Sequence, residues 1–294
     1  MRSDQKNWLN SLKNIVWYMD APGYSPAVYP MWNLTKLSRQ EKIPVLLDGQ
    51  GADESLAGYA QYKIHNIFEN FNKNKKKSNT KLFIKQLRNL VDILGFVKSI
   101  AFLFREIFPS LHLFYRKKIG FQSLMLNEVN IPRDSNNEKK KYNLRERLIR
   151  DHSLNILPGL LHYGDAISMA NSIEIRNPFL DYRLVEWVFK LPNNLLFNRN
   201  ESKWVIREYL RMNNQKLIGN RKDKKGYLTP VKKWLVSSEI KDFILSDNNP
   251  MFQWCDKKRI KKLLLLNDKG IIGTEHNLYK LLSSQLWIQE CINK

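Results

Sequence analysis

The sequence predicts an α/β fold built on a parallel sheet, in a chain that is mostly helical. A short apolar run, Ile43 to Leu47, ends at an aspartate and a glycine-rich loop, as a buried strand of such a sheet does. Beyond Gly58, helical periodicity continues to the C-terminus. Because a lone parallel strand leaves its backbone groups unpaired, we expect the sheet to be incomplete within this chain.

The 294 residues fit one large domain or two small ones. We expect a single partial domain over residues 1–294, divided into three parts. The first, 1–60, holds the end of the sheet region. The second, 61–150, is a variable, lysine-rich helical region, and the third, 151–294, is a C-terminal helical part.

Each element has its own signal in the sequence. Before the strand, apolar residues recur at helical spacing over 8–19 and 31–39, with the proline-punctuated loop DAPGYSPAVYP between them. The strand IPVLL is continuous, apolar and bounded by Pro44 and Asp48, which indicates a buried parallel strand. After it, periodicity predicts helices at 80–108, 143–169, 182–190, 202–212 and 277–293.

The net charge of +21, with a pI of about 9.8, invites an anionic partner such as nucleic acid, a membrane surface or a phosphorylated substrate. Much of the surplus lies in lysine- and asparagine-rich runs at 70–81, 133–143 and 256–262. Such runs are typical of solvated loops and helix ends, and the aromatic residues look like core positions rather than a stacking surface. We therefore expect no specific nucleic-acid binding.

The remaining composition points to a cytoplasmic protein. Cys255 and Cys291 have no CxxC spacing, which argues against a zinc ribbon or a disulfide framework and suits a reducing compartment. The N-terminus lacks the apolar region of a signal peptide. The most apolar stretch, 94–114, is interrupted by Lys98 and broken by Pro109, so we expect a buried or surface-lying helix and no transmembrane segment.

The loop after the predicted strand, DGQGADE at 48–54, has more glycine and acid than a turn requires. Ligands bind beyond the carboxyl ends of parallel strands, and Gly49 and Gly51 let backbone N–H groups approach a phosphate. Asp53 and Glu54 offer the hard oxygen ligands that Mg²⁺ prefers. The alternative is a plain strand–turn–helix in which the two acids favour the positive end of a helix.

Three later blocks carry polar residues. LPGLLHYGDAISMANSIEIRNPFLD is interpreted as a helix, a polar connection and the start of a second helix. ESKWVIREYL places Lys203, Arg207 and Arg211 at i, i+4 and i+8 on one helical face, which could bind polyphosphate or be a solvated basic face. RKDKKGYLTP is a basic cluster followed by glycine and an aromatic residue.

In order and wording, these blocks resemble the synthetase domain of glutamine-hydrolysing asparagine synthetases, of the ATP-pyrophosphatase group. LLDGQGADESLAGY resembles that family's VLSGEGADExxGGY loop, and the long central block is similar to LPxxLLRYxDRxSMAxSIExRxPFLD. SKWVIREYL and RKDKKGYLTP match its later lysine-containing helix and its RxKxGFxxP segment, and DAPGYSPAVYP weakly resembles DEPFxDPSxxP. The resemblance implies an adenine-nucleotide alpha-hydrolase-like parallel sheet.

The resemblance also implies a reaction. The side-chain carboxylate of aspartate, or of a related substrate, attacks the α-phosphate of ATP to give an acyl-adenylate and pyrophosphate. Ammonia, free or from glutamine, then displaces AMP and leaves the amide. The implied cofactors are ATP and Mg²⁺, and catalysis is largely positioning and charge neutralisation.

By position, the resemblance implies four groups of site residues. The catalytic positions are Gln50, Lys203 and Asp165. The positions that bind the nucleotide phosphates and the acyl-adenylate are Asp48, Gly49, Gly51, Arg207, Arg221 and Lys224. The substrate side is shaped by Glu174 and Arg176, and the metal is held by Asp53 and Glu54.

The chain also departs from the family pattern. Gln50 stands where the family has a glutamate, so no carboxylate base lies between the glycines, and the identity of the acceptor stays open. His162 and Ala166 replace two arginines of the central block.

Two parts of the family pattern have no match here, the ATP-binding SGGxDS loop and the glutaminase domain. We therefore expect this chain to be the latter part of a synthetase, dependent on an upstream fragment for activity. The alternative is a non-catalytic remnant or binding module of the same fold.

Overall fold

A computed structural model describes most of the chain. The described residues are 7–23, 25–73, 84, 88, 91, 99–100, 103–104, 121–126, 143–198, 201–221, 229–271 and 273–293. The helix predicted at 80–108 lies largely outside them, as do most of the apolar stretch 94–114 and the lysine-rich run 133–143.

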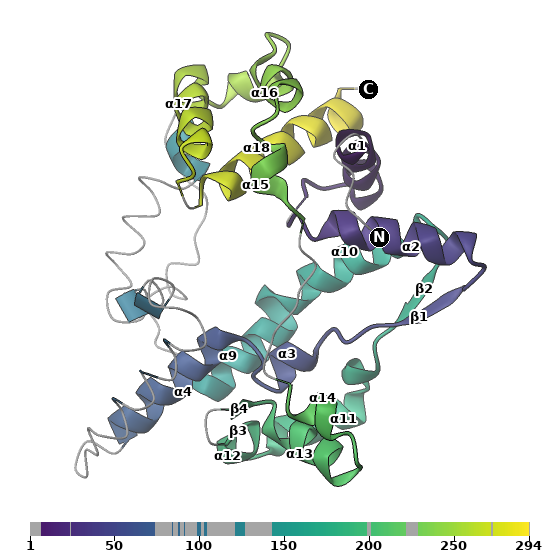
Figure 1. Ribbon diagram of the computed structural model, residues 1–294, viewed down its shortest axis with the longest axis vertical. Coiled ribbons are helices and arrows are strands. Elements are labelled where there is room, and N and C mark those ends of the chain that lie inside the picture. The colour runs from purple at the N-terminus through teal and green to yellow at the C-terminus, as the bar shows by residue number, and fades with distance from the viewer. Residues whose placement is uncertain are drawn as a thin grey trace.

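Helices make up most of the described chain (Figure 1). Two of them, α1 (Trp8–Met19) and α2 (Val28–Gln40), precede the first strand. The later α-helices are α3 (Ala52–Ser55), α4 (Ala60–Lys73), α9 (Leu144–Arg150), α10 (Leu157–Met169), α11 (Tyr182–Lys190), α12 (Asn193–Leu196), α13 (Trp204–Met212), α14 (Lys216–Gly219), α15 (Val231–Trp234), α16 (Ser238–Leu245), α17 (Lys257–Asp268) and α18 (Thr274–Trp287). The short 3₁₀ and π segments are η2 (Phe121–Leu124), η3 (Asp151–Asn155), η4 (Pro178–Leu180), η5 (Pro250–Gln253) and η6 (Ile288–Ile292).

Periodicity located several of the long helices, but it gave no range for α4 or α17. The predicted ranges 8–19 and 182–190 are the observed bounds of α1 and α11. The range 143–169 is divided into α9, the π-helical η3 and α10, because the Asp151 carboxylate turns inward there and accepts hydrogen bonds from four side chains. This interruption was not predicted.

The structure confirms a parallel sheet and supplies a second strand. Strand β1 (Val45–Leu47) pairs in parallel with β2 (Glu174–Arg176), in the register Val45 with Glu174 and Leu47 with Arg176. The sequence had indicated only a polar connection at β2. The strand was missed because side chains alternate between the two faces of a strand. Glu174 and Arg176 share one exposed face, so Ile175 is the single apolar residue within β2.

The predicted burial of the first strand was wrong. Leu47 is 75% exposed and Ile43 is 46% exposed, whereas parallel strands are normally covered on both faces. Within the described part of the chain, this sheet consists of β1 and β2 alone, so no described strand flanks β1 on its other edge. A separate hairpin, β3 (Phe197–Asn198) with β4 (Glu201–Ser202), is antiparallel.

Two hydrophobic clusters hold the described chain together. The larger joins α1, α2 and α10 to the C-terminal helices α15–α18, around Trp8, Trp234 and Tyr279. The smaller joins α3, α4, α9, α11 and α13, around Tyr62 and Leu148. In Figure 1 the C-terminal helices lie at the top, α11–α14 lie at the bottom, and β1 and β2 project at the right.

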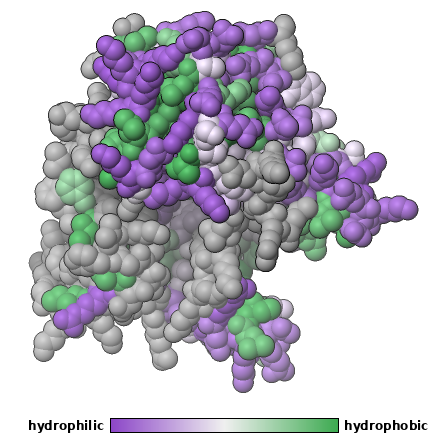
Figure 2. Space-filling model, turned by 45° about the horizontal axis from the view of Figure 1, so that its top comes forward, coloured by the Kyte–Doolittle hydropathy of each residue, from purple (hydrophilic) through white to green (hydrophobic). Residues whose placement is uncertain are grey.

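The basic run 256–262, expected to be a solvated loop or helix end, forms the N-cap and the first half of α17, a helix that was not predicted. Asp256 caps α17 by accepting from two backbone N–H groups, and Lys257 pairs with Asp247 at 2.6 Å. Arg259 donates to the carbonyls of Ser123 and Met125. Hydrophilic side chains dominate this upper end of the molecule (Figure 2). No described helix is long and apolar enough to span a lipid bilayer.

Candidate functional site

Strand pairing brings the glycine loop and the central block together. The Asp48 N–H donates to the Arg176 carbonyl at 2.9 Å, so the two strands end side by side. Gly51, with φ of +88°, lies against Leu180 of η4, and a Cβ there would overlap the Leu180 side chain. Around Gly49, by contrast, a Cβ would meet no atom within 4 Å. The loop is thus packed against Leu180 at Gly51 and has free space at Gly49, whose N–H donates to the Asp48 carboxylate at 2.7 Å.

The most informative contact joins two segments 150 residues apart. Lys203 Nζ lies 2.9 Å from Asp53 Oδ1, and both side chains are about one-quarter exposed, at 28% and 26%. Gly58 makes room for this pair, because a Cβ on Gly58 would lie 2.7 Å from Asp53 Cγ and closer still to Lys203 Cε. The Gly58 N–H also donates to the Asp53 carbonyl at 2.8 Å. Sequence reasoning had named Asp53 and Lys203 but neither their contact nor Gly58.

Two of the six non-glycine residues with left-handed backbone in the described part of the chain, Ala57 and Lys203, lie at this site. Lys203 was expected inside a helix, but it precedes α13 as the N-cap residue with φ of +58° and ψ of +33°. The β3–β4 hairpin leads directly into it. Ala57, fully buried, also has φ of +57° at a position where the family pattern has glycine. Left-handed conformations of residues other than glycine cost about 1–2 kcal/mol each and are concentrated at functional sites.

Glu54 points away from the loop opening. It is 1% exposed and accepts a hydrogen bond from the Tyr59 hydroxyl at 2.6 Å. Burial raises the pKa of the Glu54 carboxyl, while the hydrogen bond from Tyr59 opposes the shift. These contacts hold α3 against the segment before α4. The prediction that Glu54 is a metal ligand is revised accordingly, because its carboxylate faces the protein interior.

Arg207 supports the backbone rather than facing the loop. Its guanidinium donates to the carbonyls of Ser202, Gly219 and Arg221, at 2.7–3.0 Å. It thereby fixes the residues on both sides of α13 and α14. Arg221 itself is exposed at the end of this unit, and Lys224 lies outside the described residues.

Arg211 is held in the same way, by Glu201 at 2.7 Å and by Asn220 at 2.7 Å. The basic stripe expected on one helical face is therefore divided between two roles. Lys203 reaches Asp53, whereas Arg207 and Arg211 stabilise α13 and its connections. Lys63 of α4, missed by sequence reasoning, lies near Arg207, and burial lowers the pKa of its ammonium group.

The substrate-side prediction concerns the exposed face of β2. Arg176 Nε lies 2.8 Å from Glu174 Oε1, and both side chains are more than half exposed. The hydrogen bond from Arg176 lowers the pKa of Glu174. Gln50 is half-buried between the two glycines. Asp165 is exposed on α10, and within the described residues no hydrogen bond or ion pair joins it to the loop.

The residues present fit a magnesium–polyphosphate group better than a metal held by protein alone. Among the described residues, no three His, Cys, Asp or Glu side chains cluster as a metal site. Mg²⁺ commonly takes one or two carboxylates and completes its shell with water and substrate phosphates. Asp53 can supply that carboxylate and Lys203 a compensating cation, beside a glycine loop that is open at Gly49.

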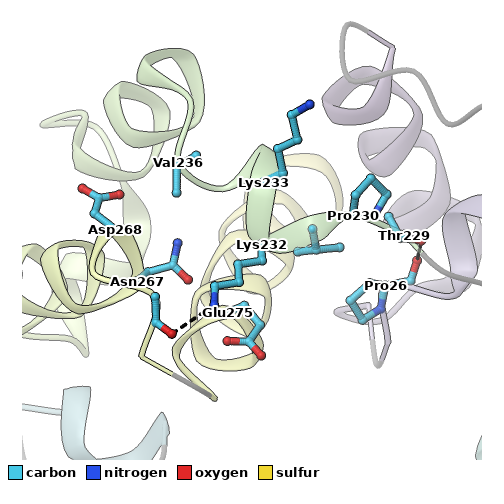
Figure 3. Close-up of a pocket in the computed structure, with 11 residues that line it drawn as sticks. Pro26, Thr229, Pro230, Lys232, Lys233, Val236, Asn267, Asp268 and Glu275 are labelled. Carbon is cyan, nitrogen blue, oxygen red and sulfur yellow. Dashed lines mark hydrogen bonds between the residues drawn. The ribbon is translucent and has the colours of Figure 1, made fainter.

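A pocket of about 620 Å³ lies at the other end of the molecule, between α15, α17 and α18 (Figure 3). It contains none of the predicted site residues. At its wall, the segments DAPGYSPAVYP and RKDKKGYLTP are in contact, because Thr229 Oγ1 donates to the Pro26 carbonyl at 2.7 Å. The Lys232 ammonium lies across the pocket and donates to the Gly270 carbonyl at 3.0 Å.

Comparison with known proteins agrees with this architecture. A family model described as asparagine synthase matches residues 1–289, nearly the whole chain. The chain belongs to the asparagine synthase family. The parallel β1–β2 pair and the helical remainder are consistent with that family's adenine-nucleotide alpha-hydrolase-like α/β domain.

Individual members of the asparagine synthase family are similar at low identity. A putative glutamine-hydrolysing asparagine synthetase of Mycobacterium bovis is 25% identical over 94% of this chain. Asparagine synthetase 1 of Bacillus subtilis, also named as glutamine-hydrolysing, is 23% identical over 81% of the chain. The chain spans 44% and 39% of these relatives, less than half of their length.

Proposed function

We propose that this chain forms part of an ATP-dependent amide-forming enzyme that works through an acyl-adenylate. The observation that carries the proposal is the Asp53–Lys203 pair at 2.9 Å, beside a glycine loop at the carboxyl end of a parallel strand. It places a carboxylate and a cation beside a glycine loop with free space at Gly49, where a polyphosphate can bind. Family membership makes aspartate, or a related carboxylate, the expected acceptor.

The proposed reaction has two displacements. A carboxylate oxygen of the acceptor bonds to the α-phosphorus of ATP, and the bond from that phosphorus to the pyrophosphate oxygen breaks. Ammonia then attacks the acyl carbon, the bond to AMP breaks, and a proton is lost from nitrogen. Asparagine, AMP and pyrophosphate are the products when the acceptor is aspartate.

The chain's own residues would act mainly by positioning and by charge. Lys203 would neutralise phosphate oxygens, and the backbone at Asp48, Gly49 and Gly51 would line the pyrophosphate. Asp53 would hold Mg²⁺, which supplies charge neutralisation when bound. Glu174 and Arg176, exposed together on β2, would contact the acceptor.

The neutral side chain of Gln50 limits its possible roles. It cannot take a proton from the incoming amine as a carboxylate could. We propose that Gln50 orients the acyl-adenylate by hydrogen bonding. Ammonia would come from glutamine through a glutaminase outside this chain, and the loop that binds the ATP phosphates would come from an upstream segment.

Product analysis of the completed enzyme tests this proposal. The chain would be combined with the unmatched part of the M. bovis relative and supplied with ATP, Mg²⁺, aspartate and ammonia. We expect AMP, pyrophosphate and asparagine in equal amounts. ADP and phosphate in place of AMP and pyrophosphate would contradict the acyl-adenylate route, since they report attack at the γ-phosphorus.

A binding module of the same fold is the second candidate. Gln50 favours it, because the loop lacks a carboxylate at that position. This candidate predicts that the completed protein binds ATP and releases no pyrophosphate in the presence of any carboxylate acceptor. Measurable pyrophosphate release would exclude it.

A further inference from the structure

Helix α17 has a buried apolar face and an exposed face rich in lysine. Ile260, Leu263 and Leu264 are buried in the larger hydrophobic cluster. On the opposite face, exposed residues recur at spacings of three and four, which places them in line along a helix. These residues, which form the lysine face, are Lys258, Lys261, Lys262, Leu265 and the C-cap residue Lys269.

The carboxylates around α17 are already paired with other cations. Three ion pairs account for them: Asp247 with Lys257 at 2.6 Å, Asp268 with Lys241 at 2.8 Å, and Asp256 with Arg259 at 3.5 Å. No carboxylate among the described residues forms an ion pair with Lys258, Lys262 or Lys269. The positive charge of these three side chains is therefore presented to solvent.

Exposed apolar side chains accompany these charges. Leu265 lies in the middle of the lysine face and is 62% exposed. Trp254, before the helix, is 45% exposed, and Ile271, after it, is 50% exposed. Helix α17 lies at the upper end of the molecule in Figure 1, and Figure 2 shows apolar side chains among the hydrophilic ones at that end. Lysines combined with exposed leucine and tryptophan are typical of helices that lie on lipid surfaces.

We propose that the lysine face of α17 is a docking surface for the anionic surface of a lipid bilayer. Charge complementarity carries the inference, because four lysines along about 17 Å of helix face a plane of negatively charged headgroups. Leu265 would reach the boundary between headgroups and acyl chains. The proposal is independent of the proposed function, since α17 packs in the larger cluster and the Asp53–Lys203 pair lies on the smaller one.

Nucleic acid is the other polyanion that a row of lysines could bind. Contacts with a phosphate backbone require only the cations, and binding of single strands is strengthened by stacking of bases on aromatic rings. The uncharged residue in the middle of the lysine face is instead aliphatic. Leu265 gains free energy by leaving water at a bilayer interface, whereas a phosphate backbone offers it no apolar contact. A lipid surface therefore fits the lysine face better than RNA does.

Sedimentation of the whole chain with lipid vesicles tests this proposal. One kind of vesicle contains a mixture of phosphatidylcholine and phosphatidylserine, and the other contains phosphatidylcholine alone. We expect the chain to bind the mixed vesicles roughly 30-fold more tightly, because each lysine near an anionic surface contributes several-fold to the affinity. This binding should weaken as added salt screens the charges.

Two triple variants test whether the lysine face is responsible. The first combines Lys258→Ala, Lys262→Ala and Lys269→Ala, and we expect roughly 30-fold weaker binding to the mixed vesicles. The matched control replaces three exposed lysines of other helices by alanine, which are Lys36 of α2, Lys190 of α11 and Lys216 of α14. The control has the same net charge and should bind within about twofold of the wild type, since charges far from the docking surface are screened. Denaturant titration would verify that both variants remain folded.

Leu265→Gln separates a lipid surface from RNA. Glutamine keeps the helix propensity but removes the apolar side chain. We expect roughly fivefold weaker binding to the mixed vesicles and unchanged binding to a single-stranded RNA of mixed sequence. Equal binding to the two kinds of vesicle, equal effects of the two triple variants, or tighter binding to the RNA than to the mixed vesicles would overturn the proposal. So would vesicle binding that Leu265→Gln leaves unchanged, because charge alone does not distinguish a lipid surface from RNA.

Discussion

The absence of a side chain at Gly58 leaves the space that the Asp53–Lys203 pair occupies. A Cβ there would overlap the Asp53 carboxylate and the Lys203 stem, so Gly58→Ala must displace one of them. We expect a loss of about 1–3 kcal/mol in the free energy of unfolding, the usual cost of overpacking. Chemical denaturation would measure it.

Gly164 provides the control for this substitution. It lies within α10, where a Cβ would meet only the Met31 methyl at 3.6 Å, an ordinary contact. Gly164→Ala should therefore be neutral or stabilise by up to about 1 kcal/mol, as alanine does in a helix. Equal destabilisation by both substitutions would contradict the steric role of Gly58.

The raised pKa of Glu54 predicts a pH-dependent stability. Between its ordinary pKa of 4.5 and its raised folded value, the folded chain binds a proton that the unfolded chain has released. The resulting stability is complete below pH 4.5 and is lost as the pH rises through the folded pKa. Glu54→Gln keeps an acceptor for Tyr59 and stays neutral.

We therefore expect Glu54→Gln to gain stability relative to the wild type as the pH rises from 4 to 8. Thermal unfolding of both proteins across that range would measure the difference. A difference in stability between the two proteins that stays constant with pH would mean that burial does not raise the pKa of the Glu54 carboxyl.

At the scale of elements, Asp151 joins α4, α9 and η3. Its fully buried carboxylate accepts from Tyr62 at 3.0 Å, Arg147 at 2.8 Å and Asn155 at 3.1 Å. Asp151→Ala would leave the buried Tyr62 hydroxyl without this acceptor and break the ion pair. We expect a loss of about 3 kcal/mol in the free energy of unfolding.

The exposed pair of Glu186 and Lys190 on α11, 4.0 Å apart, is the comparison for this network. Glu186→Gln should cost less than about 0.5 kcal/mol, because exposed ion pairs contribute little. Denaturant titration of the two variants would settle the contrast. Similar losses would show that the Asp151 network is no more stabilising than a surface contact.

The same elements show what the sequence could predict. Helical periodicity predicts α1 and α11 correctly because both helices are amphipathic: apolar residues recur on one face and polar residues on the other. The strand β2 was missed because pairing with β1, rather than local composition, makes Glu174–Arg176 extended. The position of Lys203 outside α13 was also missed, since its left-handed backbone is imposed by the preceding hairpin.

At the scale of the whole molecule, the candidate site lies on the smaller hydrophobic cluster, away from the cluster that holds both ends of the described chain. The resemblance of the sequence motifs to those of the family predicted that residues near 48–54, 174–176 and 203 belong to one site. The structure brings those three segments together, but it divides the predicted basic stripe and turns Glu54 inward. Such side-chain directions depend on tertiary contacts that a single sequence does not display.

The most direct test of the account is aspartate-dependent exchange of pyrophosphate into ATP by the completed enzyme, with Lys203 and with Lys203→Ala. We predict that Lys203→Ala lowers the exchange rate at least 100-fold while the complex still forms, because the cation beside the phosphates is removed. Lys190→Ala, at an exposed residue of α11, should exchange like the wild type. Exchange that survives Lys203→Ala at the wild-type rate would contradict the assignment of this site.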